Sequence, residues 1–287
     1  MLSDLTYLDA QAPLWLVALF LGIVLLAAGQ LLHLCYCADL WLLPPALLLG
    51  WWLLLQSVLV YLGFYDNLYA LPPRLLVLGV GPPLIGIAGL LLTGSGRCLL
   101  ARFDLVDLTW LSVVRIPVEL CLYGLALHHL VPDLITFADR NLDLAAGLTA
   151  PLAAYWFRTR LMGRRLLLLW HGGSLVLLLN VVVLAAGSVP TPWQQVGFSQ
   201  PNVAVLHWPF VWLPTFIVPL VLFSHVAALR QLLGSVHKTA PLQPSSRAGE
   251  WHLEPWFIGR SGSRGRAVLG RFLRAKSDRK PIGLAGR

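Results

Sequence analysis

Charged residues are scarce in this sequence. They make up 12% of the 287 residues, whereas soluble domains carry about a quarter. Hydrophobic residues make up 57%, and the mean hydropathy is +0.74. The apolar runs are continuous and Leu-rich instead of alternating, which excludes a membrane β-barrel. The composition predicts an all-α integral membrane protein with about seven transmembrane helices of roughly 20 residues each and no large extramembrane domain.

Lysine is absent from the apolar part of the chain. All three lysines, Lys238, Lys276 and Lys280, follow the last apolar run, so no span offers an amine for a retinal Schiff base. Residues 1–234 hold ten Arg and ten Asp or Glu, and the net charge of +8 therefore arises in residues 235–287. We expect a transmembrane bundle over 1–234 and a basic, largely disordered cytoplasmic tail over 235–287.

The tail contains a basic and apolar stretch near 264–276. In a helix, its apolar residues would share one side, which predicts an interfacial helix that is attracted to anionic lipids. A solvated tail without a helix is the alternative. Nucleic acid is not expected as a partner, and a protein partner stays unknown.

Cysteine is rare, with four residues in the chain. His33-Leu-Cys35-Tyr-Cys37 has a metal-like spacing, but a tetrahedral site needs about four ligands and the other two cysteines, Cys98 and Cys121, are isolated. We predict no metal site, no disulfide and no cofactor. Haem between paired histidines and the roles of Cys35 and Cys37 stay open.

The spans are expected near 12–34, 41–63, 74–92, 110–131, 141–157, 166–186 and 203–231. The fifth is the weakest, because it is short, begins at Asp143 and contains Pro151; a broken or half-buried helix is the alternative. Basic residues favour the cytoplasmic side. The Arg-rich link 158–165 and the basic tail therefore place the C-terminus inside and the N-terminus outside.

Span four carries two charges where charge is costly. Arg115 and Glu119 are four residues apart, which puts them on one helix face. Pro117 lies between them and removes the usual helical donor to the carbonyl of Val113. His171 falls at a similar depth in span six. We predict an internal polar site of Arg115, Glu119 and His171; a structural Arg115–Glu119 ion pair is the alternative.

A second polar group is expected at the outer face. Two outer links and the span ends beneath them hold carboxylates and amides that form a predicted ligand mouth, with ordinary solvated loops as the alternative. The members of this outer mouth are Asp139, Arg140, Asn141, Asp143, Asn180, Gln194, Gln195, Gln200, Asn202 and His207.

Prolines interrupt two predicted spans. Span seven contains three prolines at five-residue spacing, Pro209, Pro214 and Pro219, and span three contains Pro82-Pro83. Each proline removes a backbone hydrogen bond, and in transporters broken helices of this kind present free carbonyls to the substrate. A kinked packing helix is the alternative.

Several short sequence motifs resemble those of a family of uncharacterised bacterial multi-pass inner-membrane proteins. They include Arg115-Ile-Pro117-Val-Glu119, Thr136-Phe137 with Arg140-Asn141 and Asp143, and Trp208-Pro209-Phe-Val-Trp212-Leu-Pro214. The resemblance covers about residues 110–231. It implies a helical protein of the bacterial cytoplasmic membrane and no particular activity.

The sequence favours transport or sensing of a small molecule or an ion, with the outer mouth as the entry and Arg115, Glu119 and His171 as the internal site. Two alternatives stay open. One is an intramembrane enzyme for a lipid or lipid-linked substrate, with Glu119 or Asp143 as acid or base and His171 or His207 as its partner. The other is a membrane assembly or scaffold protein that acts through its tail.

Overall fold

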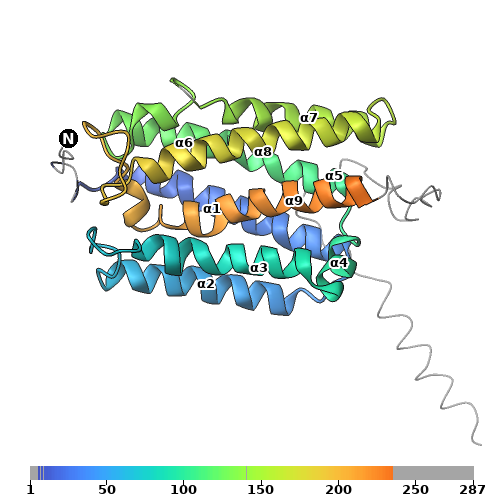
Figure 1. Ribbon diagram of the computed structural model, residues 1–287, viewed down its shortest axis with the longest axis horizontal. Coiled ribbons are helices and arrows are strands. Elements are labelled where there is room, and N and C mark those ends of the chain that lie inside the picture. Colours follow the sequence, from blue (N-terminus) through green and yellow to red (C-terminus); the bar gives the residue numbers. More distant parts are fainter. Residues whose placement is uncertain (1–5, 7, 9, 140, 235–287) are drawn as a thin grey trace, which may run out of the picture. The chain divides into compact units, whose positions relative to one another are not determined.

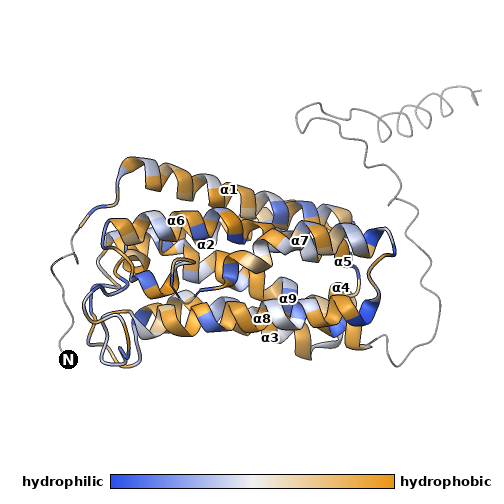
Figure 2. Cartoon of the chain, turned by 90° about the horizontal axis from the view of Figure 1, so that it is seen from above, coloured by the Kyte–Doolittle hydropathy of each residue, from blue (hydrophilic) through white to orange (hydrophobic). Residues whose placement is uncertain are grey.

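The computed structural model describes residues 6, 8, 10–139 and 141–234, and within these ranges it is all-helical. Six helices are long and apolar enough to cross a membrane, which indicates a membrane protein. Most of the visible length of these helices is hydrophobic (Figure 2). The predicted tail over 235–287, with its expected interfacial helix, lies outside the described residues.

The helical elements follow one another with short links, and π-helical or 3-10 turns precede or join several of them. They are α1 (Leu14–Cys37), α2 (Leu43–Tyr61), η1 (Leu75–Val80), α3 (Gly81–Leu92), α4 (Gly94–Leu100), α5 (Leu105–Trp110), η2 (Leu111–Val114), α6 (Arg115–Leu127), η3 (Asp133–Ile135), α7 (Asp143–Arg158), α8 (Arg164–Gly187), η4 (Ala204–Leu206), η5 (Leu213–Ile217) and α9 (Val218–Gly234).

The helices form an inner group and an outer pair. α8 packs against α7 and α9, and α6 packs against α1 and α7. α2 and α3 lie side by side along the edge of this group (Figure 1). In the most apolar 18-residue stretch of Leu105–Leu127, 61% of the residues are buried, against 6% for Leu43–Tyr61 and for Leu75–Leu92. The inner group therefore contains the core.

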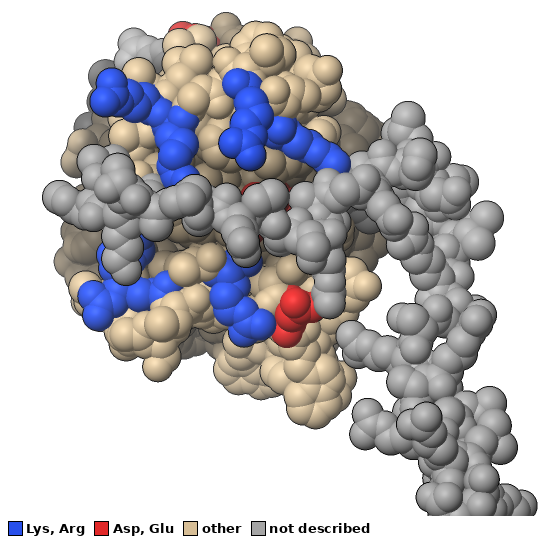
Figure 3. Space-filling model, turned by 90° about the vertical axis from the view of Figure 1, so that its right-hand side faces the viewer, with Lys and Arg blue, Asp and Glu red and all other residues tan. Residues whose placement is uncertain are grey.

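Arginines gather at one end of the bundle, here called the arginine end (Figure 3). Three hydrogen bonds bring the ends of α1, α4, α8 and α9 together there. Arg164 donates to the Gln231 carbonyl, Gln231 to the Leu100 carbonyl and Arg102 to the Asp39 carbonyl. The arginines of these segments and of the α7–α8 link are Arg97, Arg102, Arg158, Arg160, Arg164, Arg165 and Arg230.

The helix predicted as the weakest span starts deep inside the bundle. α7 has 16 residues. Asn141, just before it, is hydrogen-bonded to Glu119. α7 therefore begins level with Glu119, eight residues before α6 ends at Leu127, or about 12 Å at the helical rise. The irregular segment before α7 is lined by buried residues such as Val131 and Thr136, as backbone at membrane depth requires.

The predicted last span is shorter than expected, because helix begins at Leu213 and not near residue 203. Pro214 occupies its first turn, where a missing N–H matters least. In span four, the 3-10 turn η2 precedes Pro117, and at its end the carbonyls of Ser112 and Val113 accept backbone N–H groups. The Val113 carbonyl, which loses its usual helical donor to Pro117, is therefore bound by a backbone N–H instead.

Two carbonyls freed by proline bind side chains of α2. The Leu78 carbonyl would need an N–H from residue 82 or 83, and both are proline; the Gln56 amide donates to it at 3.2 Å. The Thr215 carbonyl, four residues before Pro219, accepts the Trp52 indole N–H at 3.0 Å. These two carbonyls anchor α2 to its neighbours, as expected of the kinked packing helix.

Candidate functional site

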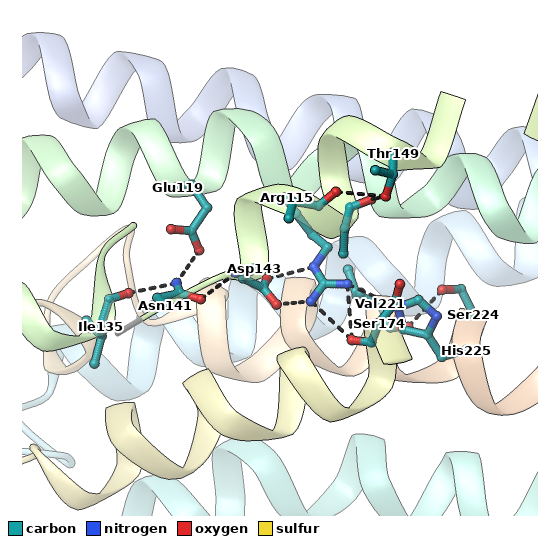
Figure 4. Close-up of polar contacts among 12 residues, drawn as sticks. Arg115, Glu119, Ile135, Asn141, Asp143, Thr149, Ser174, Val221, Ser224 and His225 are labelled. Carbon is teal, nitrogen blue, oxygen red and sulfur yellow. Dashed lines mark hydrogen bonds and ion pairs between the residues drawn. The ribbon is translucent and has the colours of Figure 1, made fainter. Parts of the chain in front are cut away.

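Arg115 lies at the start of α6 and is 2% exposed. Its Nε donates to Asp143 Oδ2 at 2.6 Å, and its Nη2 forms an ion pair with Asp143 Oδ1. This is the two-pronged geometry that makes Arg–carboxylate pairs strong. The Ser174 carbonyl accepts from both terminal nitrogens at 3.3–3.4 Å. The guanidinium thus joins α6 to α7 and α8 at the centre of the inner group (Figure 4).

The start of α7 is built to meet Arg115. Asn141 Oδ1 accepts the backbone N–H of Asp143 at 2.8 Å, and Asp143 lies in the first turn, where a negative charge is favoured. Gly147, one turn later, allows α7 to approach α6 closely. A Cβ at this position would lie 2.9 Å from Ile116 Cγ1 and 3.3 Å from Arg115 Cβ.

Glu119 does not pair with Arg115 in the way that the four-residue spacing suggested. Its Oε1 accepts from Asn141 Nδ2 at 2.6 Å, and the same amide donates to the Ile135 carbonyl at 2.8 Å. Asp143 is the ionic partner of Arg115 because it reaches the guanidinium from a neighbouring helix with both oxygens. Glu119 Oε2 is buried and makes no hydrogen bond of good geometry among the described residues, and the Phe137 backbone interacts with the carboxylate.

Two histidines extend the network toward the arginine end. His225 Nε2 lies 3.3 Å from Arg115 Nη1, His225 Nδ1 lies 3.0 Å from His171 Nδ1, and His171 Nε2 lies 3.2 Å from Thr109 Oγ1. The Thr109 hydroxyl donates to the Leu105 carbonyl at 2.7 Å. Arginine has only donors, so the direction of hydrogen-bond donation along this chain is fixed. Arg115 donates to His225, His225 to His171, His171 to Thr109 and Thr109 to the Leu105 carbonyl, and both imidazoles are neutral.

A cavity of about 220 Å³ opens beside this network. Its walls come from η1, α6, α8, η5 and the start of α9 and are mostly aliphatic, with Leu122, Val181 and Leu213 as examples. Arg115, Glu119 and Asp143 are the charged groups that line it together with Arg74. Asn202 also lines the cavity, and its Oδ1 is a second buried acceptor without a hydrogen-bond partner among the described residues.

The residues of the predicted outer mouth separate into groups. Asn141 and Asp143 are buried in the internal network, so they join Arg115 and Glu119 in one site. Several others bind backbone carbonyls of loops or helix ends: Gln194 binds those of Val196 and Gly197, Gln200 those of Ala126 and Val131, Asn202 that of Ala185, and His207 that of Leu8.

The remaining members are Asp139, Gln195 and Asn180, which are exposed, and Arg140, which lies outside the described residues. His207 also lines a second hollow, of about 490 Å³, between residues 10–17 and the segment 204–210. The sequence prediction did not include His225 in the internal site. Its position in an otherwise apolar span was a sequence signal, as it was for His171.

The comparisons with known proteins place the chain in a family. Residues 72–233 match the model of a domain of unknown function, DUF8737. Because this match covers more than half of the chain, the protein belongs to that uncharacterised family. The matched region contains every residue of the network around Arg115. No curated protein and no solved structure matches the chain.

Proposed function

We propose that this is a seven-span protein of the bacterial cytoplasmic membrane that binds a small amphipathic molecule in the cavity beside Glu119, as a step in transport or sensing. The observation that carries the proposal is the unpartnered Glu119 Oε2 at the wall of an aliphatic cavity. A buried polar atom without a hydrogen bond costs about 1–3 kcal/mol. A ligand that supplies the missing hydrogen bond recovers this free energy.

The chemistry of the cavity lining indicates which kind of ligand would bind. The two unpartnered atoms, Glu119 Oε2 and Asn202 Oδ1, are both acceptors, so the matching ligand group is a donor such as a hydroxyl or an amine. The aliphatic remainder of the lining favours an apolar body. The volume lies above the roughly 150 Å³ of an engineered cavity that takes benzene, so one end of a lipid or a compact amphipathic molecule fits.

The proposed topology has the N-terminus outside and the arginine end in the cytoplasm, where Lys and Arg are enriched. α7 with the irregular segment before it supplies the seventh crossing. The tail over 235–287 would then lie on the cytoplasmic side and meet anionic lipids there.

The test is native mass spectrometry of the full chain released gently from detergent, with every retained small molecule recorded. Leu122 and Leu125 offer a matched pair, since both are buried in α6 and only Leu122 lines the cavity. We expect Leu122→Phe to lose the retained molecule while Leu125→Phe keeps it, and Glu119→Gln to weaken retention. Equal retention by both leucine variants would refute a ligand in this cavity.

The same experiment separates the alternatives. The enzyme alternative pairs Glu119 or Asp143 with His171 or His207. His171 contacts His225 and Thr109, and His207 contacts the Leu8 carbonyl, so neither histidine is hydrogen-bonded to Glu119 or Asp143 among the described residues. Conversion of a retained lipid over time would nevertheless favour the enzyme. Loss of the cellular phenotype on deletion of residues 240–287, with ligand retention unchanged, would favour the scaffold protein.

A further inference from the structure

A second group of polar side chains lies apart from the cavity, where α1 ends beside α5. His33 and Cys37 are four residues apart on α1 and so share a face, and Asp107 comes from α5. One ligand atom from each of the three residues lies within 4.8 Å of the others. Cys37 Sγ is 3.5 Å from His33 Nε2.

The sulfur–nitrogen distance between Cys37 and His33 matches the ligand shell of a zinc ion. Zn–S and Zn–N bonds of about 2.3 and 2.05 Å at a tetrahedral angle separate the sulfur and nitrogen by about 3.6 Å. We propose that His33, Cys37 and Asp107 bind one Zn²⁺ ion. The imidazole nitrogen, thiolate and carboxylate are all common zinc ligands, and a thiolate with a carboxylate neutralises the two charges of the ion.

The ligand set differs from the one that the sequence spacing suggested. Cys35 is buried and does not belong to the cluster, and Asp107 is 70 residues away from Cys37 in the chain. Cys37 is exposed, so an ion can enter from solvent. Asp104 and Asp39 interact electrostatically with Cys37, and Arg158 interacts with Asp107.

Three protein ligands leave the fourth tetrahedral position for water or a further ligand, as in open zinc sites. The ion would join α1, which lies outside the matched family region, to α5 within it. Zinc binding at this site is independent of the cavity beside Glu119.

The experiment uses the full chain, purified in detergent under a thiol-free reductant and freed of metal with a chelator. Zn²⁺ is titrated in competition with a chromophoric chelator, and Co²⁺ is added separately to report the thiolate-to-cobalt charge-transfer band. We expect one Zn²⁺ per chain and a charge-transfer band. Cys37→Ser should abolish the band and weaken Zn²⁺ binding at least about tenfold, because even the loss of an outer-shell partner costs 10–100-fold.

The controls assign the ligands. Cys35→Ala and Cys98→Ser should keep both the band and the affinity, whereas Asp107→Asn should lower the affinity and keep the band. A charge-transfer band that survives Cys37→Ser, or that disappears equally in Cys35→Ala, would overturn the proposed ligand set. A chain that binds no Zn²⁺ at micromolar concentration while its helical circular dichroism is intact would overturn the site.

Discussion

The segment Leu105–Leu127, which ends in α6, and the segment Leu75–Leu92, which ends in α3, are both long and apolar enough to cross a membrane, yet they occupy opposite environments. α6 lies inside the bundle with Arg115 and Glu119 buried, and α3 lies at the edge and has no buried residue in its α-helical part. Lipid is as apolar as leucine, so hydrophobicity alone does not draw a helix inward. Polar partners do, and α6 has several across α7, α8 and α9.

The edge pair α2–α3 is held by a different kind of contact. Two of its links are side-chain hydrogen bonds from α2 to carbonyls before prolines: Gln56 donates to Leu78 in η1, and Trp52 donates to Thr215 in η5. In return, Trp212 donates its indole N–H to the Leu53 carbonyl at 3.0 Å. The inner helices are therefore joined through an ion pair, whereas α2 and the segment after it are joined to their neighbours through hydrogen bonds to backbone carbonyls.

The largest effect is expected from Arg115→Met. Removing one partner of a buried ion pair typically costs 3–5 kcal/mol, because the remaining charge is left unpaired. Asp143 would be that remaining charge. Unfolding of the purified protein in detergent mixtures, followed by circular dichroism, measures the loss.

Arg97→Met is the matched control, since Arg97 is exposed in α4 and its loss should change stability by less than about 0.5 kcal/mol. The double variant Arg115→Met/Asp143→Leu should be more stable than Arg115→Met alone because it removes both charges. If Arg115→Met and Arg97→Met were equally stable, the central ion pair would have no part in holding the inner helices.

The apolar runs of the sequence predicted the helices well because length and hydropathy are local properties. The residues of the internal site were also visible, since charge in an apolar run is rare. The pairing of these residues could not be predicted. Whether Arg115 pairs with Glu119 on its own helix or with Asp143 on another depends on how α7 packs against α6. That docking depends on Gly147 and on the depth at which α7 begins, which no pattern in the chain gives.

The outer mouth was predicted for a related reason. Asn141 and Asp143 follow an outer link in the sequence, so they were placed at the surface. In the structure the segment before α7 enters the bundle, and these two residues are 1% and 4% exposed. The role of Gln56 likewise follows from which elements meet, because only the approach of α2 to η1 brings its amide to the Leu78 carbonyl.

An intermediate effect is expected from glycine substitutions that compare the two regions. Gly147→Ala places a methyl group 2.9 Å from Ile116 Cγ1 and 3.2 Å from the Ile116 backbone nitrogen. Such overpacking costs about 1–3 kcal/mol. Gly86→Ala in α3 meets nothing within 4 Å, so it should be neutral or stabilise the helix by up to about 1 kcal/mol. The same unfolding assay measures the stability of both variants. A Gly147→Ala protein at least as stable as Gly86→Ala would contradict the close approach of α7 to α6.

The smallest effect is expected at the hydrogen bonds between the two regions. Trp52→Phe keeps an aromatic ring but removes the N–H that binds the Thr215 carbonyl. A neutral hydrogen bond contributes about 0.5–1.5 kcal/mol. Trp51→Phe is the matched control on the same helix, because Trp51 is 57% exposed. We expect the Trp52 variant to unfold earlier and to expose the α2–α3 pair to limited proteolysis before the inner helices. Equal behaviour of the two variants would show that the pair is held by apolar packing, and the freed carbonyls would then have no anchoring role.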